Sequence, residues 1–388
     1  MSKLGVALLG TGAVAPVHVN GFAVLPNDCE IRALVDLNQE GAQKLKDSMN
    51  LTAADIYEDY KEVLARTDID AVVICLPPKV HCAVAVAALK AGKHVLIEKP
   101  MASSLEECDL ILEAAQKAGK LVSVVSNNRY KAPTMKVKQM LDEQAAGKLL
   151  FTTVNSLWWR GVSYHDIWWR GTWQSEGGGC LMSHAVHHID LMQWMIGMPE
   201  KVKATVGNVG HYNAEVEDFA IATLHYPGMM ANLNAGIVFH GELQELVFQT
   251  EEARISIPWE PKASLAHPNG FPYENPDLVE KLNKRYEEIP ELEHEGHTGQ
   301  IVNFIRAILG QEELLITGKD GRNTIELIMA MYKSSVEERS VALPIAKDDA
   351  FYTFDGMVAS MPKFFEKIRS VDKFPDAPPI SFGRDVGK

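Results

Sequence analysis

A glycine-rich turn follows the first apolar run of the chain. Residues 10–15 read GTGAVA, and Asp36 ends the second apolar run, 24 residues after Gly12. In a G-x-G-x-x-A turn the first glycine permits a tight bend, the second lets a ligand approach the backbone, and the alanine keeps the following helix close to the strand. The N–H groups at the start of that helix can then bind phosphate.

A carboxylate at the position of Asp36 hydrogen-bonds the hydroxyls of a ribose and repels a 2′-phosphate. The spacing therefore predicts a dinucleotide site for NAD rather than NADP. An ordinary strand–helix turn beside a surface aspartate is the competing interpretation. The cofactor-binding residues predicted in this part of the chain are Gly10, Gly12, Ala13, Val14 and Asp36.

Two further segments contain groups that could move a proton. In the first, Lys99 lies in Glu98-Lys99-Pro100, directly after a short apolar run. Because parallel sheets bind ligands beyond the carboxyl ends of their strands, an ammonium at this place could hold a substrate hydroxyl. A solvated lysine in a loop is the alternative.

The second segment reads GGGCLMSHAVHHIDLMQWMIG over residues 177–197. On a helix with 100° per residue, Ser183, His187, Asp190 and Trp194 fall on one face. We expect the triple glycine to let a ligand come close. Two of the histidines are three residues apart, which could suit a metal. The HExxH pattern and an acidic ligand at the usual spacing are both missing, so no metal site is predicted.

Tryptophan is concentrated in one stretch of the chain. WWRG occurs at residues 158–161 and again at 168–171, and five of the seven tryptophans lie between Trp158 and Trp173. Flat rings can pack on the C–H face of a sugar or polyphenol, while arginines hydrogen-bond its hydroxyls. Packing at the start of a sheet competes with this interpretation, and we favour packing for the first tryptophan pair. We expect ligand contact from residues 164–173.

The elements that must position these groups alternate between strand and helix over the first 130 residues. Apolar runs predict strands at 4–9, 30–35, near 56, 71–76, 94–97 and 121–125. Helical periodicity predicts helices at 15–25, 38–49, 60–66, 80–91 and 103–118, the last opened by a Ser103-x-x-Glu106 capping box. This alternation predicts an α/β fold with an N-terminal, doubly wound Rossmann domain.

The pattern changes at about Phe151. Alternating strands are predicted at 202–206, 217–225, 230–238 and 244–249, and helices at 132–143, 181–196, 300–309 and 322–338. They indicate an α+β C-terminal domain with a large, mostly antiparallel sheet that leaves one face open. We expect residues 258–296 to form a long excursion, and the segment after Leu343 to be a docking arm or partly mobile.

We therefore divide the chain into an NAD-binding domain (1–128), a substrate-binding and oligomerisation domain (129–345) and a C-terminal tail (346–388). The apolar face of the open sheet predicts a homo-oligomer.

Composition sets the limits on partners and location. The 388 residues have a net charge of −13, which argues against a nucleic-acid or anionic membrane surface as the main partner. No apolar run is long enough to span a membrane, and the first residues have no secretory cleavage pattern. The five cysteines have no CxxC spacing, so we expect buried free thiols in a reducing cytoplasm.

Taken together, these motifs resemble the Gfo/Idh/MocA family of sugar and cyclitol oxidoreductases over roughly residues 3–345. The resemblance is carried by GTGAVA, Asp36, Pro77–His81, Glu98-Lys99-Pro100 and the glycine-led helix with His187-x-x-Asp190. It implies that Lys99 and His187 are catalytic and that His81 lies near the cofactor. The cofactor-binding residues that it adds are Leu76, Pro77, His81, Glu98 and Lys99.

One departure from the family pattern concerns the helix. Many members have an aspartate four residues before the helix histidine, where this chain has Ser183, and a glycine where it has Ala185. A hydroxyl can orient a sugar but cannot supply the same charge. His184 is a candidate to compensate.

The resemblance implies NAD-dependent hydride transfer from a secondary alcohol of a sugar or glycoside in a cleft between the two domains. His187 would accept the hydroxyl proton, and Lys99 would stabilise the alkoxide. The WWRG segments favour glucose-type rings, including the 3-hydroxyl of a plant C- or O-glycoside. Inositol dehydrogenation, an NAD-dependent glycosidase acting through a keto-sugar, and a dinucleotide-sensing regulator are the alternatives. The predicted substrate-binding residues are Asn128, Arg129, Tyr164, His165, Trp168, Arg170, Ser183, His184 and His187.

Overall fold

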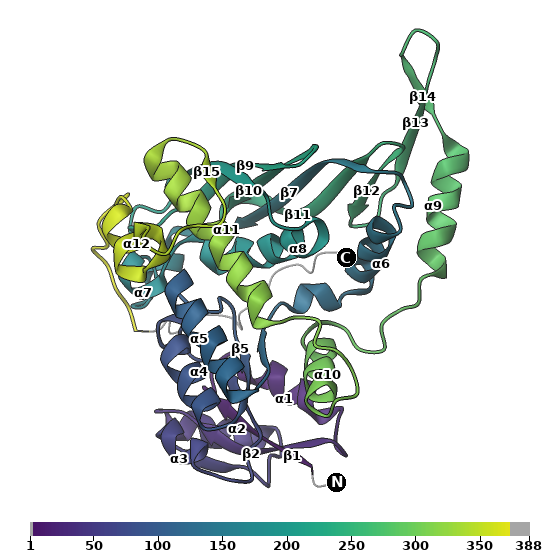
Figure 1. The fold of residues 1–388 in the computed structure, drawn as a ribbon. Helices are drawn as coiled ribbons and strands as arrows, with labels where there is room; N and C mark the ends of the chain where they lie inside the picture. Colours follow the sequence, from purple (N-terminus) through teal and green to yellow (C-terminus); the bar gives the residue numbers. More distant parts are fainter. Residues whose placement is uncertain (1–2, 373–388) are drawn as a thin grey trace. The chain divides into compact units, whose positions relative to one another are not determined.

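The computed structural model describes residues 3–372, which form two compact units (Figure 1). The first unit contains residues 3–130, 293–325 and 352–354. The second contains residues 131–292, 326–351 and 355–372. Residues 293–325, predicted as part of the second domain, thus belong to the first unit. Within the described part of the chain, no helix has the length and apolar character needed to cross a membrane.

The first unit is built on a six-stranded sheet in the order β3-β2-β1-β4-β5-β6, in which every neighbouring pair is parallel. This confirms the doubly wound sheet. The winding reverses between β1 and β4, and such a switch point is where these sheets bind ligands. The strands are β1 (Leu4–Leu9), β2 (Cys29–Val35), β3 (Asp55–Tyr57), β4 (Ala71–Ile74), β5 (His94–Ile97) and β6 (Val122–Val124).

The helices of the first unit follow the predicted positions closely. One correction concerns the cap of α5, where Ser104 rather than Ser103 accepts the N–H of Glu107. The Glu107 carboxylate in turn accepts the N–H of Ser103, so the capping motif lies one residue further on. The helices are α1 (Ala15–Ala23), α2 (Gln39–Ser48), α3 (Tyr60–Leu64), α4 (His81–Lys90) and α5 (Leu105–Ala118), with 3₁₀ turns at Pro78–Val80 and Asn127–Tyr130.

Helix α10 (Gly296–Ile308) joins the first unit although it is far along the chain. Its Ile301, Phe304 and Ile305 are buried in one apolar cluster with Val19 and Phe22 of α1. Burial of this stripe explains why residues 293–325 fold with the nucleotide-binding sheet. Sequence order alone had suggested the second domain.

The second unit is built on a nine-stranded sheet in the order β14-β13-β12-β11-β7-β10-β9-β8-β15. Only the β7–β10 pair is parallel among its described strands, so the sheet is mostly antiparallel, as predicted. The strands are β7 (Leu149–Trp159), β8 (Lys201–Gly207), β9 (Phe219–Tyr226), β10 (Met229–Gly236), β11 (Val238–Thr250), β12 (Ala253–Ile257), β13 (Lys262–Ala266), β14 (Pro272–Glu274) and β15 (Val341–Ala342).

Alternation along the central strands gives this sheet two different faces. Leu224 of β9 and Leu233 of β10 are buried on the covered face. Ile221 and Met230 lie on the opposite face and are exposed. The helical elements of the unit are α6 (Ala132–Asp142), α7 (Trp173–Glu176), α8 (Val186–Ile196), α9 (Pro276–Glu288), the main part of α11 (Gly318–Glu337) and α12 (Phe354–Ser360), with 3₁₀ turns at Val162–Asp166 and Ala350–Tyr352.

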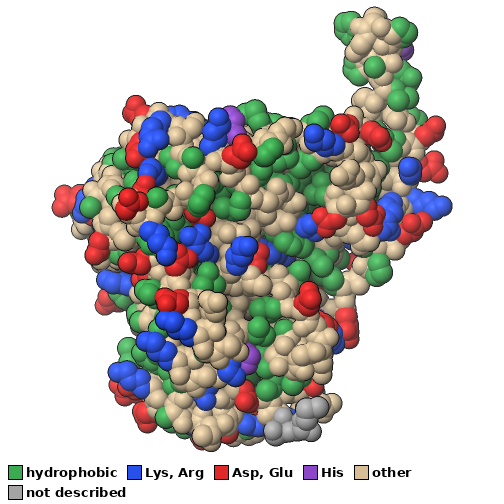
Figure 2. Space-filling view, viewed as in Figure 1, with side chains coloured by type: hydrophobic (Ala, Val, Ile, Leu, Met, Phe, Trp, Pro, Cys, Tyr) green, Lys and Arg blue, Asp and Glu red, His purple; other side chains and the backbone are tan. Residues whose placement is uncertain are grey.

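Residues 258–296, expected to form a long excursion, contain a β-hairpin and a helix. The β13–β14 hairpin and helix α9 lie at the end of the sheet and project from the rest of the second unit (Figure 1). Asn275 caps α9 by accepting the N–H of Leu278, followed by Pro276 at the first helical position. Hydrophobic side chains gather at the hairpin tip, where Phe271 is 69% exposed (Figure 2).

The described part of the predicted tail docks on its own chain. Val371 forms a β-bridge with Ile167, and the Lys367 ammonium donates to the carbonyl oxygens of His165, Ile167 and Arg170. Arg369 also forms an ion pair with Asp166. This stretch therefore fixes the backbone of the second WWRG segment. Residues 373–388 of the predicted tail lie outside the described residues.

Candidate active site

The glycine turn lies at the carboxyl end of β1 and leads into α1. Gly10 has φ +98°, and a Cβ at this position would lie 2.4 Å from the carbonyl oxygen of Cys75. At Gly12, by contrast, a Cβ would meet no described atom within 4 Å. Gly10 is therefore required by the packing of the turn itself, whereas Gly12 leaves open space above the backbone, where a ligand can approach.

The amides of this turn fit a pyrophosphate. The N–H groups of Gly12, Ala13 and Val14 have no hydrogen-bond partner within residues 3–372. They lie at the start of α1, where the helix dipole also favours an anion. The four predicted residues of the turn thus form a cradle suited to the phosphates of a dinucleotide.

Asp36 follows β2, which pairs with β1, and its carboxylate is held against the same turn. Its Oδ2 accepts the N–H of Thr11 at 2.8 Å and the Thr11 hydroxyl at 2.7 Å, and its Oδ1 accepts the N–H of Asn38 at 2.8 Å. The side chain is only partly buried. Thr11, which positions Asp36, was not predicted from the sequence, because an x position in the glycine motif gives no signal of its own.

Glu98 has a structural role beneath Lys99. It is almost fully buried, and its Oε1 lies 2.8 Å from the Nε2 of His18. Burial alone would raise the pKa of this carboxyl, but the His18 hydrogen bond and the charges of His18, His297 and Lys99 lower the pKa to about 2. Glu98 is thus a carboxylate held by the protein, and His18 is a second residue that sequence reasoning missed.

Lys99 lies just past the carboxyl end of β5, as predicted. The side chain is partly exposed, and its backbone N–H donates to Glu98 Oε2 at 3.2 Å. A cis peptide bond joins it to Pro100. A partly exposed ammonium next to a buried carboxylate can meet a ligand while its backbone stays fixed.

His81 is fully buried at the start of α4. Its Nδ1 is 2.9 Å from the carbonyl oxygen of Pro100, and its Nε2 is 2.7 Å from the carbonyl oxygen of Leu76. Burial lowers the pKa of this imidazole, although both backbone contacts act in the opposite direction. His81 therefore links the loop after β4 to the Lys99 loop. Leu76 and Pro77, which are more exposed, remain the candidates for direct contact with a cofactor.

The predicted Asn128–Arg129 pair divides into one accessible and one buried residue. Arg129 is completely buried, and its guanidinium pairs with Asp320 at 3.1 Å. Burial alone would raise the pKa of Asp320, but the charge of Arg129 and hydrogen bonds from Thr317 lower it. We therefore leave Arg129 out of the proposed substrate site. Asn128 is partly exposed and stays in it.

In the second unit, the predicted helix 181–196 begins differently from a regular α-helix. Leu181–Ala185 is π-helical, and α8 starts only at Val186. A π-helical turn holds more residues than an α-helical one, so the angle of 100° per residue does not relate Ser183 to His187. His187 itself is on α8 and is partly exposed. Single π turns are frequent at functional sites.

Ser183 and His184 form a pair at this π turn. The Ser183 hydroxyl donates to the carbonyl oxygen of Gly179 at 2.7 Å, and its Oγ lies 2.8 Å from the Nδ1 of His184. The His184 ring also packs against the rings of Trp158 and Tyr164. Trp158 is buried, as the packing role predicted for the first tryptophan pair requires, but Trp159 is 44% exposed, so the prediction is wrong for the second member of the pair.

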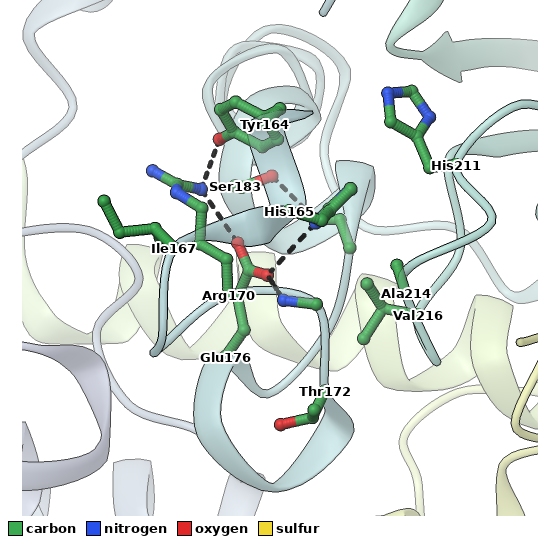
Figure 3. A network of polar contacts seen from close by, with 12 residues as sticks. Tyr164, His165, Ile167, Arg170, Thr172, Glu176, Ser183, His211, Ala214 and Val216 are labelled. Atoms are coloured by element: carbon green, nitrogen blue, oxygen red, sulfur yellow. Dashed lines mark hydrogen bonds and ion pairs between the residues drawn. The ribbon is translucent and has the colours of Figure 1, made fainter. Parts of the chain in front are cut away.

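Tyr164, Arg170 and Glu176 form a polar network beside this pair (Figure 3). The Arg170 guanidinium donates to the Tyr164 hydroxyl and to Glu176 Oε1, and it stacks 4.2 Å from the centre of the Tyr164 ring. Burial raises the pKa of Tyr164 to about 12 although Arg170 lowers it. Glu176 was not predicted, because a glutamate before three glycines gives no signal. The Tyr164 hydroxyl in this network is therefore neutral, and Glu176 holds the Arg170 guanidinium in a fixed position.

His165 and Trp168 belong to the same segment but differ in exposure to solvent. His165 is buried, and neither ring nitrogen has a hydrogen-bond partner among residues 3–372. Its Nδ1 lies 3.9 Å from Glu176 Oε2, and the ring meets His211 edge-on. Burial, with the charges of His211, Arg170 and Lys367, lowers its pKa to about 3. The structure thus gives His165 a packing role, and we leave it out of the proposed substrate site. Trp168 is 58% exposed and remains a candidate for ligand contact.

Sequence comparison agrees with this geometry. A profile described as the oxidoreductase family, NAD-binding Rossmann fold, matches residues 4–126. A profile for the GFO/IDH/MocA C-terminal domain matches residues 134–256.

The relatives include proteins of similar length. The chain is 26% identical over 351 residues to the uncharacterized oxidoreductase YrbE of Bacillus subtilis, covering 89% of this chain and 98% of that protein. It is 29% identical over 199 residues to the D-glucoside 3-dehydrogenase of Escherichia coli, covering 51% of this chain and 55% of that protein.

Among solved structures, the WlbA dehydrogenase from Bordetella pertussis in complex with NADH and UDP-GlcNAcA superimposes with a TM-score of 0.76 at 26% identity. The match covers 89% of this chain and 99% of that one. Both matched segments, residues 4–126 and 134–256, thus belong to the same family, and the first of them contains the glycine turn with its free amides. The chain is an oxidoreductase of the GFO/IDH/MocA family with an NAD-binding Rossmann domain.

Proposed function

We propose that the protein is an NAD-dependent dehydrogenase for a secondary hydroxyl of a glucose-type sugar or glycoside. The observation that carries the cofactor part is the cradle of unpaired amides at Gly12–Val14 with Asp36 held beside it by Thr11. The carboxylate can accept hydrogen bonds from a ribose diol, and its charge opposes a 2′-phosphate. NAD, when bound, would take the hydride that leaves the carbinol carbon.

Lys99 and His187 divide the remaining work. His187 would accept the hydroxyl proton through a ring nitrogen, and the Lys99 ammonium would stabilise the negative charge that develops on the oxygen. A positioned base contributes on the order of 10²–10⁴-fold. The rest of the rate must come from alignment of the substrate. The proposal requires both side chains to approach the same hydroxyl.

The substrate part of the proposal is supported by the aromatic and polar residues of the second unit. Trp168 offers an exposed ring, Arg170 is fixed by Glu176, and Ser183 and His184 form a hydroxyl–imidazole pair. Apolar faces with a few oriented polar groups are typical of carbohydrate sites. The similarity to a D-glucoside 3-dehydrogenase supports the 3-hydroxyl of a glucoside as the first substrate to test.

The experiment is a substrate screen that follows NADH absorbance with glucose, O- and C-glucosides, inositols and their keto forms. We expect NADH formation with a glucoside and recovery of a 3-keto product. NADH formation with an inositol alone would replace the sugar assignment. Release of the aglycone without net NADH would instead indicate a glycosidase that acts through a keto-sugar.

Substitution of Lys99 tests the catalytic assignment. Lys99→Met should lower kcat by on the order of 10²-fold or more while NAD binding, measured by fluorescence, is retained. The control is Lys90→Met, which removes the same charge from the exposed end of α4. Full turnover by the Lys99 variant would exclude this residue from the mechanism.

Two further proposals concern the oligomeric state of the enzyme and its location in the cell. We propose that the open face of the nine-stranded sheet joins copies of the chain in a homo-oligomer. We also propose that the enzyme works in the cytoplasm, because all five cysteines are free thiols, of which four are buried.

A further inference from the structure

A buried glutamate holds the start of the segment that leads to His187. Glu217 precedes β9 and is 0% exposed. Its Oε2 accepts the N–H of Gly179 at 2.8 Å, and its Oε1 accepts the N–H of Leu181 at 3.0 Å. Its own carbonyl oxygen accepts the N–H of Cys180 at 3.1 Å. One residue therefore binds three consecutive amides at the entrance of the π turn.

The triple glycine fits this arrangement closely. A Cβ at Gly179 would lie 1.8 Å from the carbonyl oxygen of Glu217, and one at Gly178 would lie 2.2 Å from the Tyr332 hydroxyl. Gly178 also has φ +155°. Gly178 and Gly179 are thus needed because Tyr332 and Glu217 approach the backbone. This packing accounts for two of the three glycines without a ligand, and the expectation that the triple glycine admits a ligand stays a prediction.

Tyr332 of α11 completes the site by donating its hydroxyl to Glu217 Oε1 at 2.9 Å. Within residues 3–372, no lysine, arginine or histidine forms an ion pair with Glu217. Burial raises the pKa of this carboxyl to about 7, although the amides and Tyr332 lower it. A carboxylate without a cation is costly to bury, so a purely structural role would favour a neutral side chain.

We propose that Glu217 is a positioning residue: by accepting the amides of Gly179 and Leu181, it fixes the direction in which the π turn and α8 present His187 to substrate. The proposal rests on the proposed function of His187 as the base. A carboxylate suits the task because both of its oxygens accept hydrogen bonds from amides that open a helical segment, and its charge is favoured there.

Glutamine cannot replace the glutamate in this role. In the Glu217→Gln variant, one end of the side-chain amide would be an NH₂ group and would face a backbone N–H donor. Either Gly179 or Leu181 would therefore lose its partner, and the start of the segment would shift. Displacements of about 1 Å at a reacting group can lower a rate on the order of 10²-fold.

The test compares three variants. Glu217→Gln should lower kcat on the order of 10²-fold, while KM for NAD is unchanged, because the phosphate cradle belongs to the other unit. Tyr332→Phe keeps both amide contacts and should cause a smaller loss. Asp218→Asn is the matched control, because this equally buried neighbour binds the amides of Val209 and Gly210 instead. It should lose thermal stability but keep kcat.

Amide hydrogen exchange gives a readout that needs no substrate. Glu217→Gln should raise exchange over residues 179–187, and Asp218→Asn over residues 207–211. Faster exchange at 179–187 with unchanged kcat would overturn the positioning role. Unchanged exchange there would overturn the structural basis itself. If Glu217→Gln does not fold, the proposal is tested with Tyr332→Phe instead. Normal kcat and normal amide exchange in Tyr332→Phe would contradict the proposal. A protein inactive on every sugar tested would refute the proposed function but leave the exchange result to stand.

Discussion

At the scale of a single residue, we propose that Asp36 determines cofactor choice. Thr11 holds its carboxylate at the glycine turn, and in the proposed binding mode its charge would oppose a 2′-phosphate. We expect Asp36→Ala to lower the ratio of kcat/KM for NAD over NADP by about tenfold or more, since it removes both the ribose acceptor and the repulsion. Asp47→Asn, on the exposed side of α2, is the control for net charge. An unaltered ratio would refute the ribose assignment.

A second prediction at the scale of a single residue concerns how Glu98 makes the free energy of unfolding depend on pH. Its folded pKa of about 2 lies below the ordinary value of 4.5, so it contributes stability that is complete above pH 4.5 and is lost as the pH falls toward 2. The shift corresponds to about 3 kcal/mol at neutral pH. Denaturant unfolding should therefore show Glu98→Gln much less stable than the parent at pH 7, with a difference that shrinks steadily as the pH falls from 4.5 toward 2. A constant difference across this range would contradict the role of its charge.

At the scale of elements, the sequence predicted most of the first sheet because its strands are buried on both faces and read as uninterrupted apolar runs. It also predicted that Gly10, Asp36 and Lys99 would lie at strand ends. It could not reveal the partners of buried polar groups. His18 with Glu98, and Glu217 with Gly179, are 80 and 38 residues apart in the chain. Only the tertiary fold brings such groups together.

Long-range packing explains the other differences. Helix α10 was predicted as a helix, but its place in the first unit depends on contacts with α1 that leave no local signal. The π turn at Leu181–Ala185 begins at amides that Glu217 binds. This contact leaves no trace in the local periodicity, which suggested a regular helix. The β13–β14 hairpin was missed because its residues are largely exposed and show little alternation.

The glycine turn gives a prediction at this scale through two alanine substitutions. Gly10→Ala would force a side chain into a positive φ and against Cys75, so the free energy of unfolding should fall by at least about 1–2 kcal/mol. Gly12→Ala meets open space and should leave the melting temperature unchanged. Its methyl group would instead occupy the approach of the pyrophosphate and raise KM for NAD. Equal effects of the two variants on both measurements would contradict the cradle.

At the scale of the whole molecule, the open face of the large sheet bears on association. Ile221, Met230, Phe151 and Leu243 lie on this face by strand register, and Ile221 is 53% exposed. Apolar groups gathered on one sheet face are unusual for a monomer, and they support the proposed association of copies through this face. The face also has a polar row in which Asn155 contacts both Asn234 and Glu245. Such a row could fix the register of two copies.

If copies of the chain associate through this face, as proposed, Ile221→Lys should prevent their association, because burying an ammonium without a partner at the interface is costly. Light scattering should report the monomer mass of 42.9 kDa for this variant and a multiple of it for the parent. Leu110→Lys places the same change at an exposed site on α5 of the first unit and should leave the mass of the parent unaltered. A monomeric parent, or an Ile221 variant that stays associated, would exclude this face as the interface. The same variant also tests whether association matters for catalysis. If loss of association lowers kcat and leaves NAD binding unchanged, contact between copies stabilises the sheet next to Glu217. Glu217 would then pass this effect to the helix that bears His187.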